Sequence, residues 1–157
     1  MAKFTSPPVV GLPEDTHTTA QNRLGMQATD DYGRTWVYVN YPAAVVQGNW
    51  VTFNAAGLAP LLAANAIGPV GVAGGAGGAG SFGWACVVAR NGVPARLAAN
   101  CADGGRLGFE GAAGVAGDGR AAGDEIYNAY ARSATTGAAA LGFAQIINPF
   151  VDDVNGA

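Results

Sequence analysis

Short apolar runs recur through most of the chain after residue 34, as is typical of β-strands. The runs are rich in valine and aromatic residues, and segments rich in glycine separate them. Many short strands joined in this way predict an all-β fold, a small barrel or sandwich, preceded by an extended N-terminal arm. The expected strands are 35–41, 45–53, 70–73, 82–89, 93–98, 106–109, 125–132 and 141–147.

A tight hairpin is expected in the middle of the chain. Asn91-Gly92 favours a type I′ turn, which would pair the strands on either side of it. That register does not place Cys86 opposite Cys101, so the two cysteines are predicted to be free, buried thiols, as is usual for a protein made in a reducing cytosol.

Residues 59–67 are the one stretch that favours a helix, with Pro60 in its first turn and Gly68 at its C-terminal cap. The surrounding residues 55–76 are uncharged and long enough to cross a bilayer. However, prolines and glycines interrupt them, and alanine and glycine are only weakly apolar. The sequence therefore predicts no membrane partner.

Three sequence regions differ in character. Residues 1–25 contain three prolines and several apolar residues, which predicts an extended arm that is either disordered or, as the apolar residues favour, ordered on a neighbouring molecule. Residues 26–150 are expected to form a single β-barrel-like domain. Residues 151–157 carry two aspartates and are expected to be a flexible, exposed tail.

Charge is distributed unevenly along the chain. No Asp, Glu, Lys or Arg occurs in residues 35–89, and only 12% of all residues are charged, against about a quarter in an average soluble domain. The net charge of −3 offers no basic surface for phosphates, which argues against nucleic acid as a partner. A small domain cannot bury so long an uncharged segment in its own core. We therefore expect much of its surface to contact other protein.

Candidate chemistry is sparse. Residues 75–80 match the glycine pattern of dinucleotide sites, but a strand is expected after them where such a site needs a helix. His17 is the single histidine, which leaves no basis for a catalytic triad or a structural zinc site. The acidic pairs, such as Asp30-Asp31, fall at element boundaries and are interpreted as solvated turn residues. We predict no catalytic, metal or cofactor site, and hence no enzyme.

The aromatic residues are concentrated in the uncharged segment. Strand 35–41 would place Trp36 and Tyr38 on one face and Tyr41 on the other, and neither face carries a charge. Either both faces are core, or one is core and the other is a subunit interface, where tryptophan and tyrosine are enriched. The second reading is preferred. With the arm residues, the predicted interface set is Phe4, Pro7, Pro8, Leu12, Pro13, Trp36, Tyr38, Tyr41, Trp50, Phe53 and Trp84.

Several short motifs occur in a familiar order. An N-terminal arm is followed by Trp36-Val37-Tyr38-Val39, Gly48-Asn49-Trp50-Val51, Ile67-Gly68-Pro69-Val70, a Gly/Ala loop, Phe82-Gly83-Trp84 and a Gly/Ala-rich C-terminal half. Over residues 34–147 this pattern resembles the small head decoration, or cement, proteins of tailed bacteriophages. The strand that begins Phe82-Gly83-Trp84 after the Gly/Ala loop is its most specific part.

The resemblance implies an all-β, barrel-like fold without catalysis. It further implies homotrimers on the three-fold axes of the capsid that clamp neighbouring major capsid proteins. Such a protein is made in the host cytoplasm and resides on the exterior of the virion. The interface set above would then contact other subunits and the capsid. The alternative is a head adhesin that binds glycans on the host surface through exposed aromatic residues and glycine loops.

Overall fold

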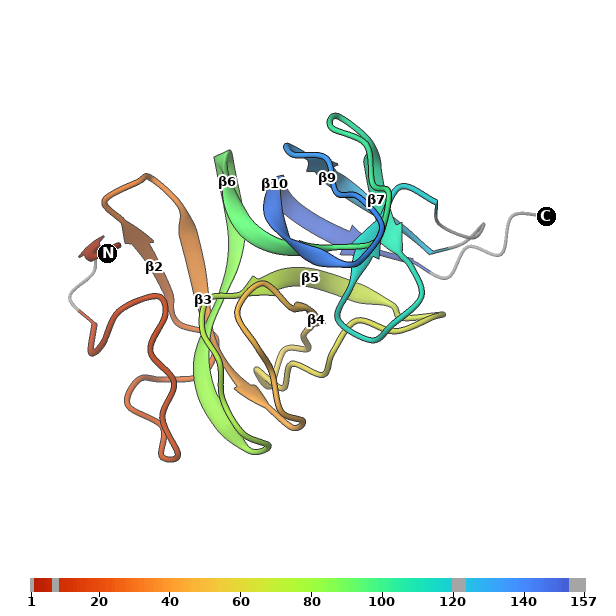
Figure 1. The fold of residues 1–157 in the computed structure, drawn as a ribbon. Helices are drawn as coiled ribbons and strands as arrows, with labels where there is room; N and C mark the ends of the chain where they lie inside the picture. The colour runs from red at the N-terminus through yellow and green to blue at the C-terminus, as the bar shows by residue number, and fades with distance from the viewer. Residues whose placement is uncertain (1, 7–8, 120–123, 153–157) are drawn as a thin grey trace.

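The computed structural model describes residues 2–6, 9–119 and 124–152, and within them the protein is all-β, as predicted. One ten-stranded sheet contains every strand of this described part (Figure 1). No described residue belongs to a helix long and apolar enough to cross a membrane. The strands are β1 (Phe4–Ser6), β2 (Gln27–Asp30), β3 (Thr35–Tyr41), β4 (Trp50–Thr52), β5 (Gly68–Ala73), β6 (Ser81–Leu97), β7 (Arg106–Phe109), β8 (Ala116–Gly117), β9 (Glu125–Ala131) and β10 (Ala140–Val151).

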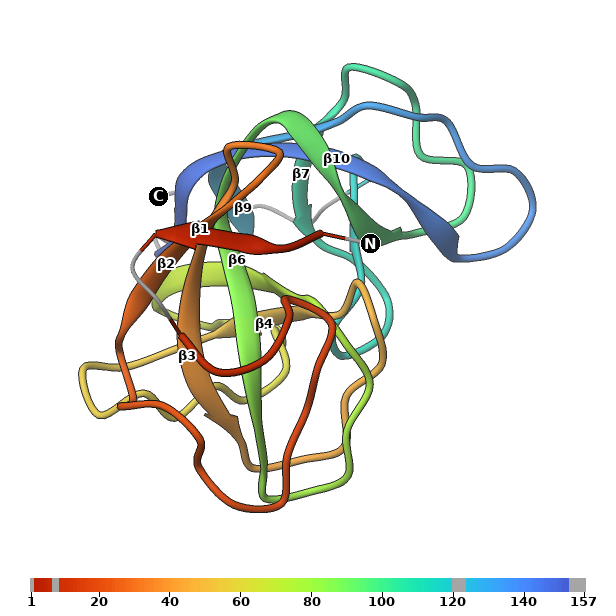
Figure 2. The same ribbon diagram turned by 90° about the vertical axis from the view of Figure 1, so that its left-hand side faces the viewer.

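The 17-residue strand β6 connects the two halves of the sheet. Its first half pairs with β3 along one edge and with β5 along the other, and its second half pairs with β10 (Figure 2). The end of β6 also contacts β8, so that β6, β8, β7, β9 and β10 close into a ring of strands. The ribbon of β1, β2 and β3 extends from this ring on the other side of β6.

The expected hairpin at Asn91-Gly92 is wrong, because β6 continues through it without turning. Val93 pairs with Ala144 of β10 and Ala89 pairs with Ile146, which leaves residues 90–92 opposite Gln145 as a bulge. Gly92 has φ +97°, a conformation that glycine adopts at little cost. Pairing with the distant strand β10 therefore overrides the local turn preference. Gly92 supplies the positive φ of the bulge instead of that of a turn.

The helix expected over residues 59–67 is also wrong. Its first part, residues 59–62, lies beside β4, where the N–H of Leu62 donates to the carbonyl of Trp50 at 2.8 Å and the N–H of Thr52 donates to the carbonyl of Pro60 at 3.0 Å. A turn follows, in which the N–H of Ala66 donates to the carbonyl of Ala63. A helix of two turns gains few internal hydrogen bonds, so bonds to β4 are the better alternative for this backbone. The strand expected over 45–53 is shorter than predicted and consists of β4 alone.

Several other sequence predictions are confirmed. The expected strands 35–41 and 106–109 coincide with β3 and β7, and 125–132 differs from β9 by one residue. Strand β10 runs further than expected, because Val151 still pairs with Ile126 of β9. Most of the expected tail lies outside the described residues. Cys86 and Cys101 are both free and buried, as predicted.

Strand β3 is buried on both faces by the protein's own chain. Trp36 and Tyr38 lie in one hydrophobic cluster, and Val37, Val39 and Tyr41 lie in a second cluster on the opposite side. The neighbouring strands β4, β5 and β6 are divided between the two clusters in the same way. A strand buried on both faces has no position at which a charge would be solvated. Burial on both faces therefore accounts for much of the uncharged sequence.

The N-terminal segment lies on its own sheet, which corrects the expectation of an arm that is disordered or ordered on a neighbour. Strand β1 pairs with β2, and the ring of Phe4 lies 4.5 Å from that of Trp84. His17 and Phe82 exchange two backbone hydrogen bonds, each 2.8 Å long. The N–H of Gln21 donates to the hydroxyl of Tyr38 at 3.0 Å. The described part of residues 1–25 thus belongs to the folded domain.

Residues 13–16 cross the glycine loop after β5 at van der Waals distance. Thr16 donates from its hydroxyl to the carbonyl of Ala76, and a Cβ at residue 75 would overlap the carbonyl oxygen of Glu14. We expect Gly75→Ala to displace this crossing and to cost about 1–3 kcal/mol of unfolding free energy. Limited proteolysis should then cleave the N-terminal segment faster.

Gly78→Ala is the matched control, because a Cβ there would meet no atom within 4 Å. Its effect should stay within about 0.5 kcal/mol. Equal proteolysis of the two variants would contradict the crossing described above.

Candidate functional site

The aromatic residues predicted to form an interface are mostly core. Trp36, Tyr38, Tyr41, Trp50 and Trp84 are each at most 2% exposed within a single chain. Their prediction as interface residues is therefore corrected, because no second molecule is needed to bury them. Strand periodicity showed two uncharged faces, but it did not show that the chain itself covers both.

The remaining members of the predicted set lie nearer the surface. Phe4, Leu12 and Phe53 are half-buried and Pro13 is buried. Phe4 packs against the cluster of Trp84, whereas Phe53 packs on the second cluster. Pro7 and Pro8 lie outside the described residues. The structure thus does not bring the predicted set together into one surface.

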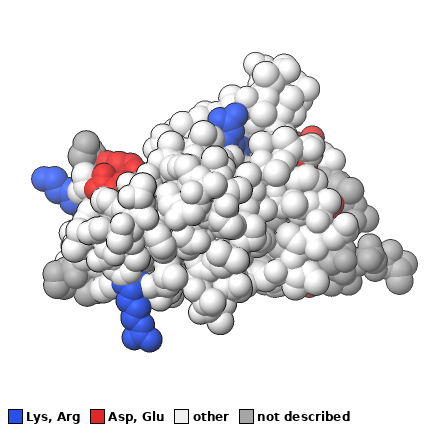
Figure 3. All heavy atoms as spheres, turned by 90° about the horizontal axis from the view of Figure 1, so that it is seen from below, with Lys and Arg blue, Asp and Glu red and all other residues white. Residues whose placement is uncertain are grey.

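An extended uncharged surface is formed instead by the loops between the central strands. The connections β3–β4, β4–β5 and β5–β6 lie on the lower side of the molecule in Figure 1. Seen from that side, charged side chains are few and surround a broad area without charge (Figure 3). We call the exposed residues of these three connections the uncharged loop surface; they are Pro42–Ala44, Val46, Gln47, Asn54–Ala56, Leu58, Pro60, Ala63–Asn65, Ile67, Ala76 and Gly78–Gly80.

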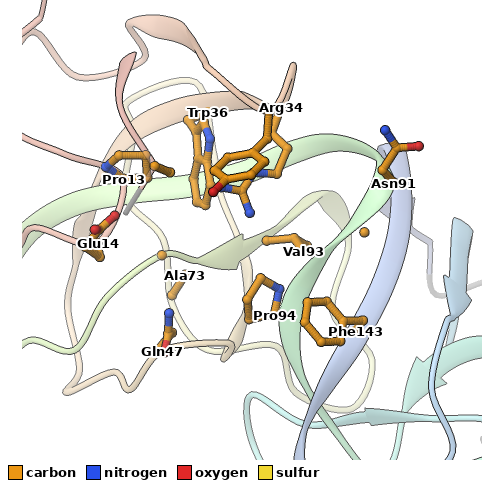
Figure 4. Close-up of a pocket in the computed structure, with 14 residues that line it drawn as sticks. Pro13, Glu14, Arg34, Trp36, Gln47, Ala73, Asn91, Val93, Pro94 and Phe143 are labelled. Carbon is orange, nitrogen blue, oxygen red and sulfur yellow. The ribbon is translucent and has the colours of Figure 1, made fainter.

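A pocket of about 490 Å³ lies between the N-terminal segment, the start of β3 and the bulge of β6. Arg34 and Trp36 lie across it from Val93, Pro94 and Phe143 (Figure 4). We call it the Arg34 pocket. Its other lining residues are Ala2, Pro13, Glu14, Tyr32, Gln47, Ala73, Gly74, Asn91 and Gly92.

A buried carboxylate fixes one wall of the Arg34 pocket. The side chain of Asp30 is fully buried and accepts the Nε–H of Arg34 at 2.7 Å and the indole N–H of Trp36 at 2.8 Å. It also accepts the backbone N–H groups of Tyr32 at 2.9 Å and Arg34 at 3.0 Å. These four hydrogen bonds close the turn between β2 and β3 and set the orientation of Arg34.

Two aromatic rings flank the guanidinium group. Its central carbon lies 4.8 Å from the ring centre of Tyr32 and 5.3 Å from that of Trp36, within the range of cation–π contacts. The Arg34 side chain is only 15% exposed. Among the described residues, no group hydrogen-bonds to its two terminal nitrogens. The pocket therefore contains an oriented cation with donors still available.

A second pocket, of about 470 Å³, is lined by both apolar and amide side chains. Val37, Phe53, Val70, Val87 and Phe150 are among its lining residues. The ring of Phe150 also stacks on Tyr127 at a centroid distance of 4.8 Å. This pocket offers apolar contact area, but no charged side chain lines it in the described part of the chain.

The other reactive groups are isolated. Burial raises the pKa of the Cys86 thiol far above its usual range. Burial, together with the nearby Asp118 carboxylate, raises the pKa of Cys101 to about 11, so both thiols are neutral at physiological pH. Nε2 of His17 is buried without a hydrogen-bond partner in the described structure. The described residues contain no cluster of three or more potential metal ligands.

Sequence reasoning missed the Arg34 pocket because Asp30-Asp31 was interpreted as a solvated acidic pair. Only Asp31 fits that description, since it is exposed, whereas Asp30 is buried. A usable signal was the spacing of two from Asp30 through Tyr32 and Arg34 to Trp36 around a tight turn. That spacing brings an acid, a cation and two rings to one side of the β2–β3 hairpin.

Comparison with known proteins adds no further constraint. No protein-family model matches the chain, and no curated protein matches it.

Proposed function

We propose that this chain is a structural virion protein that binds the outer surface of a bacteriophage capsid as a homotrimer and cements neighbouring major capsid proteins. The uncharged loop surface is the observation that carries the proposal. Ile67, at 72% exposure, and Val46, at 45%, are large apolar side chains within it. A broad surface of this kind is typical of one that is covered by other protein. The order of the short sequence motifs, which resembles that of phage decoration proteins, is the second argument for the proposal.

The physical logic of cementing agrees with such a surface. A symmetric oligomer presents the same patch several times to a repeating lattice. Weak individual contacts then act together, because each bound subunit raises the effective concentration of the next. Such a role requires no catalysis, cofactor, nucleic acid or membrane contact. The protein would be synthesised in the host cytoplasm and act on the capsid exterior.

The folded N-terminal segment changes which residues we propose for contact. Because Phe4 and Pro13 are held against the protein's own sheet, the loops replace the arm as the main contact region. In this proposal the buried aromatic residues stabilise the domain, and the small exposed residues of the loops approach the capsid closely.

A charge-addition experiment tests the proposal. The triple variant Ala43→Glu, Ala55→Glu and Ala63→Glu places three charges on exposed positions of the uncharged loop surface. We expect its affinity for capsids that lack the protein to fall at least about tenfold, since a charge buried unpaired in an interface is strongly unfavourable. Co-sedimentation with capsids measures the affinity, and light scattering should give a mass near three times 15.6 kDa for the unmodified protein.

The matched control adds the same charge elsewhere. Ala134→Glu, Ala138→Glu and Ala139→Glu change exposed alanines in the β9–β10 connection. This variant should bind capsids as the unmodified protein does. If both variants bind equally well, the loop surface is not the contact, and if the unmodified protein binds no capsid, the cement function is rejected.

A glycan-binding head adhesin is a second candidate function. The Arg34 pocket favours it, because this pocket combines exposed rings with polar side chains, as sugar sites do. Binding of the purified protein to host cells without capsids would support this candidate, and absence of such binding would count against it.

A further inference from the structure

The guanidinium of Arg34 is held in place before any ligand binds. Its Nε–H is fixed by Asp30 at 2.7 Å, and the rings of Tyr32 and Trp36 lie beside its plane. Such a side chain loses little conformational freedom when its outer nitrogens bind a ligand. The planar pair of outer nitrogens matches the two oxygens of a carboxylate.

Asp30 leaves the two outer nitrogens of the Arg34 guanidinium without a hydrogen bond to it. Three of the four hydrogen bonds that Asp30 accepts come from other donors: the indole of Trp36 and the backbone N–H groups of Tyr32 and Arg34. Only Nε of the guanidinium contacts Asp30 by a hydrogen bond. The carboxylate therefore orients Arg34 from behind, and the two outer nitrogens remain available on the pocket side.

Three further polar side chains line the same pocket. They are Glu14, Gln47 and Asn91, and in Figure 4 they lie at different points around it. Within residues 2–6, 9–119 and 124–152, none of these side chains makes a hydrogen bond to protein. A carboxylate accepts hydrogen bonds from hydroxyl groups of a ligand, and an amide can either donate to such groups or accept from them. Their spread suits a ring that carries hydroxyls in several directions.

The rim of the pocket supplies flat apolar surface. Tyr32 is 62% exposed and Phe143 is 52% exposed, although both are large rings. Rings of this kind pack on the C–H face of a sugar. The volume of about 490 Å³ lies within the range of small-ligand pockets and exceeds what one acidic amino-acid side chain would fill.

We propose that the Arg34 pocket binds an acidic sugar, such as a uronic acid unit of a glycan. The sugar carboxylate pairs with the outer nitrogens of Arg34, its hydroxyls contact Glu14, Gln47 and Asn91, and its ring packs on Tyr32 or Phe143. The inference gives the adhesin candidate a ligand class and does not depend on capsid binding. Failure of either test therefore leaves the other interpretable.

Titration of the purified full-length protein with monosaccharides tests the site, with ligand-observed NMR as the readout. Glucuronate is compared with glucose and galacturonate with galactose, because each pair differs only at the carboxylate carbon. Acetate represents the carboxylate alone. We expect one acidic sugar to bind at least about tenfold more tightly than both its neutral counterpart and acetate. This is the difference in affinity that one charge-assisted hydrogen bond typically gives. N-Acetylneuraminate is included as a second kind of acidic sugar.

Two variants locate the binding. Arg34→Lys retains the positive charge but removes the planar pair of outer nitrogens, and it should weaken binding of the acidic sugar about tenfold. Because this change affects a partly buried ion pair, Phe143→Ala provides a second variant at an exposed position, with an expected loss of about threefold to tenfold. Leu141→Ala, two residues away on β10 and 50% exposed, does not line the pocket and should leave binding unchanged.

The outcomes are distinct. Tighter binding of an acidic sugar that is lost in Phe143→Ala but kept in Leu141→Ala supports the site. Equal binding of the acidic and neutral sugars overturns the role of Arg34. A minimal ligand of this size typically binds with a Kd of about 1 mM, so the titration extends to about 10 mM. The proposal as a whole is overturned if no acidic sugar shows saturable binding in this range.

Discussion

Asp30→Ala is expected to lower the free energy of unfolding by about 3–5 kcal/mol, the cost typical of breaking a buried ion pair on one side. The change would leave the indole N–H of Trp36 and two backbone N–H groups without their acceptor. It would also leave the Arg34 guanidinium largely buried beside two rings with no counter-charge. Chemical denaturation followed by tryptophan fluorescence measures the loss.

Asp103→Ala is the control for this prediction. Asp103 is an exposed carboxylate in a turn, and its removal should change the stability by less than about 0.5 kcal/mol. Similar small losses in both variants would mean that the Asp30 hydrogen bonds contribute little to the fold. They would also remove the basis for a fixed orientation of Arg34.

Trp50→Ala is expected to cost about 3–5 kcal/mol, which is typical for a large aromatic side chain removed from a core. Trp50 is fully buried, and its indole N–H donates to the carbonyl of Arg96 at 3.0 Å. For a chain of this length such a loss lowers the melting temperature by roughly 6–20 °C. Thermal unfolding followed by circular dichroism measures it, and Leu141→Ala, on the surface, should shift it far less.

The same variant separates two explanations of the aromatic residues. If Trp50 were an interface residue, its replacement would lower the oligomer mass and leave the stability of the subunit nearly unchanged. Burial within one chain instead predicts loss of subunit stability, whatever the oligomeric state. Light scattering on the folded variant distinguishes the two.

Local sequence patterns predict correctly those strands whose residues have a high intrinsic preference for β-structure. Residues 35–41, rich in β-branched and aromatic side chains, and residues 106–109 fold as expected. The predictions failed where distant pairing decided the outcome. Asn91-Gly92 forms a bulge because β10 pairs on both sides of it, and residues 60–62 are extended because they exchange backbone hydrogen bonds with β4.

The candidate site was less predictable than the fold. Alternation along β3 identified two apolar faces, but only the folded chain reveals that its own residues cover both. The Arg34 pocket combines residues from the N-terminal segment, the β2–β3 turn, β6 and β10, including Glu14 and Phe143. No local window of sequence contains that combination, and the spacing of two from Asp30 to Trp36 indicates only one wall of the pocket.

The continuity of β6 has a mechanical consequence. The N-terminal ribbon reaches β6 through β3, and the C-terminal strand β10 pairs with β6 directly. Much of a force applied between the two ends of the domain is therefore carried across this one strand. The halves share its backbone, so we expect them to rupture in a single step rather than in succession. Such a subunit would bear load as one unit until it fails.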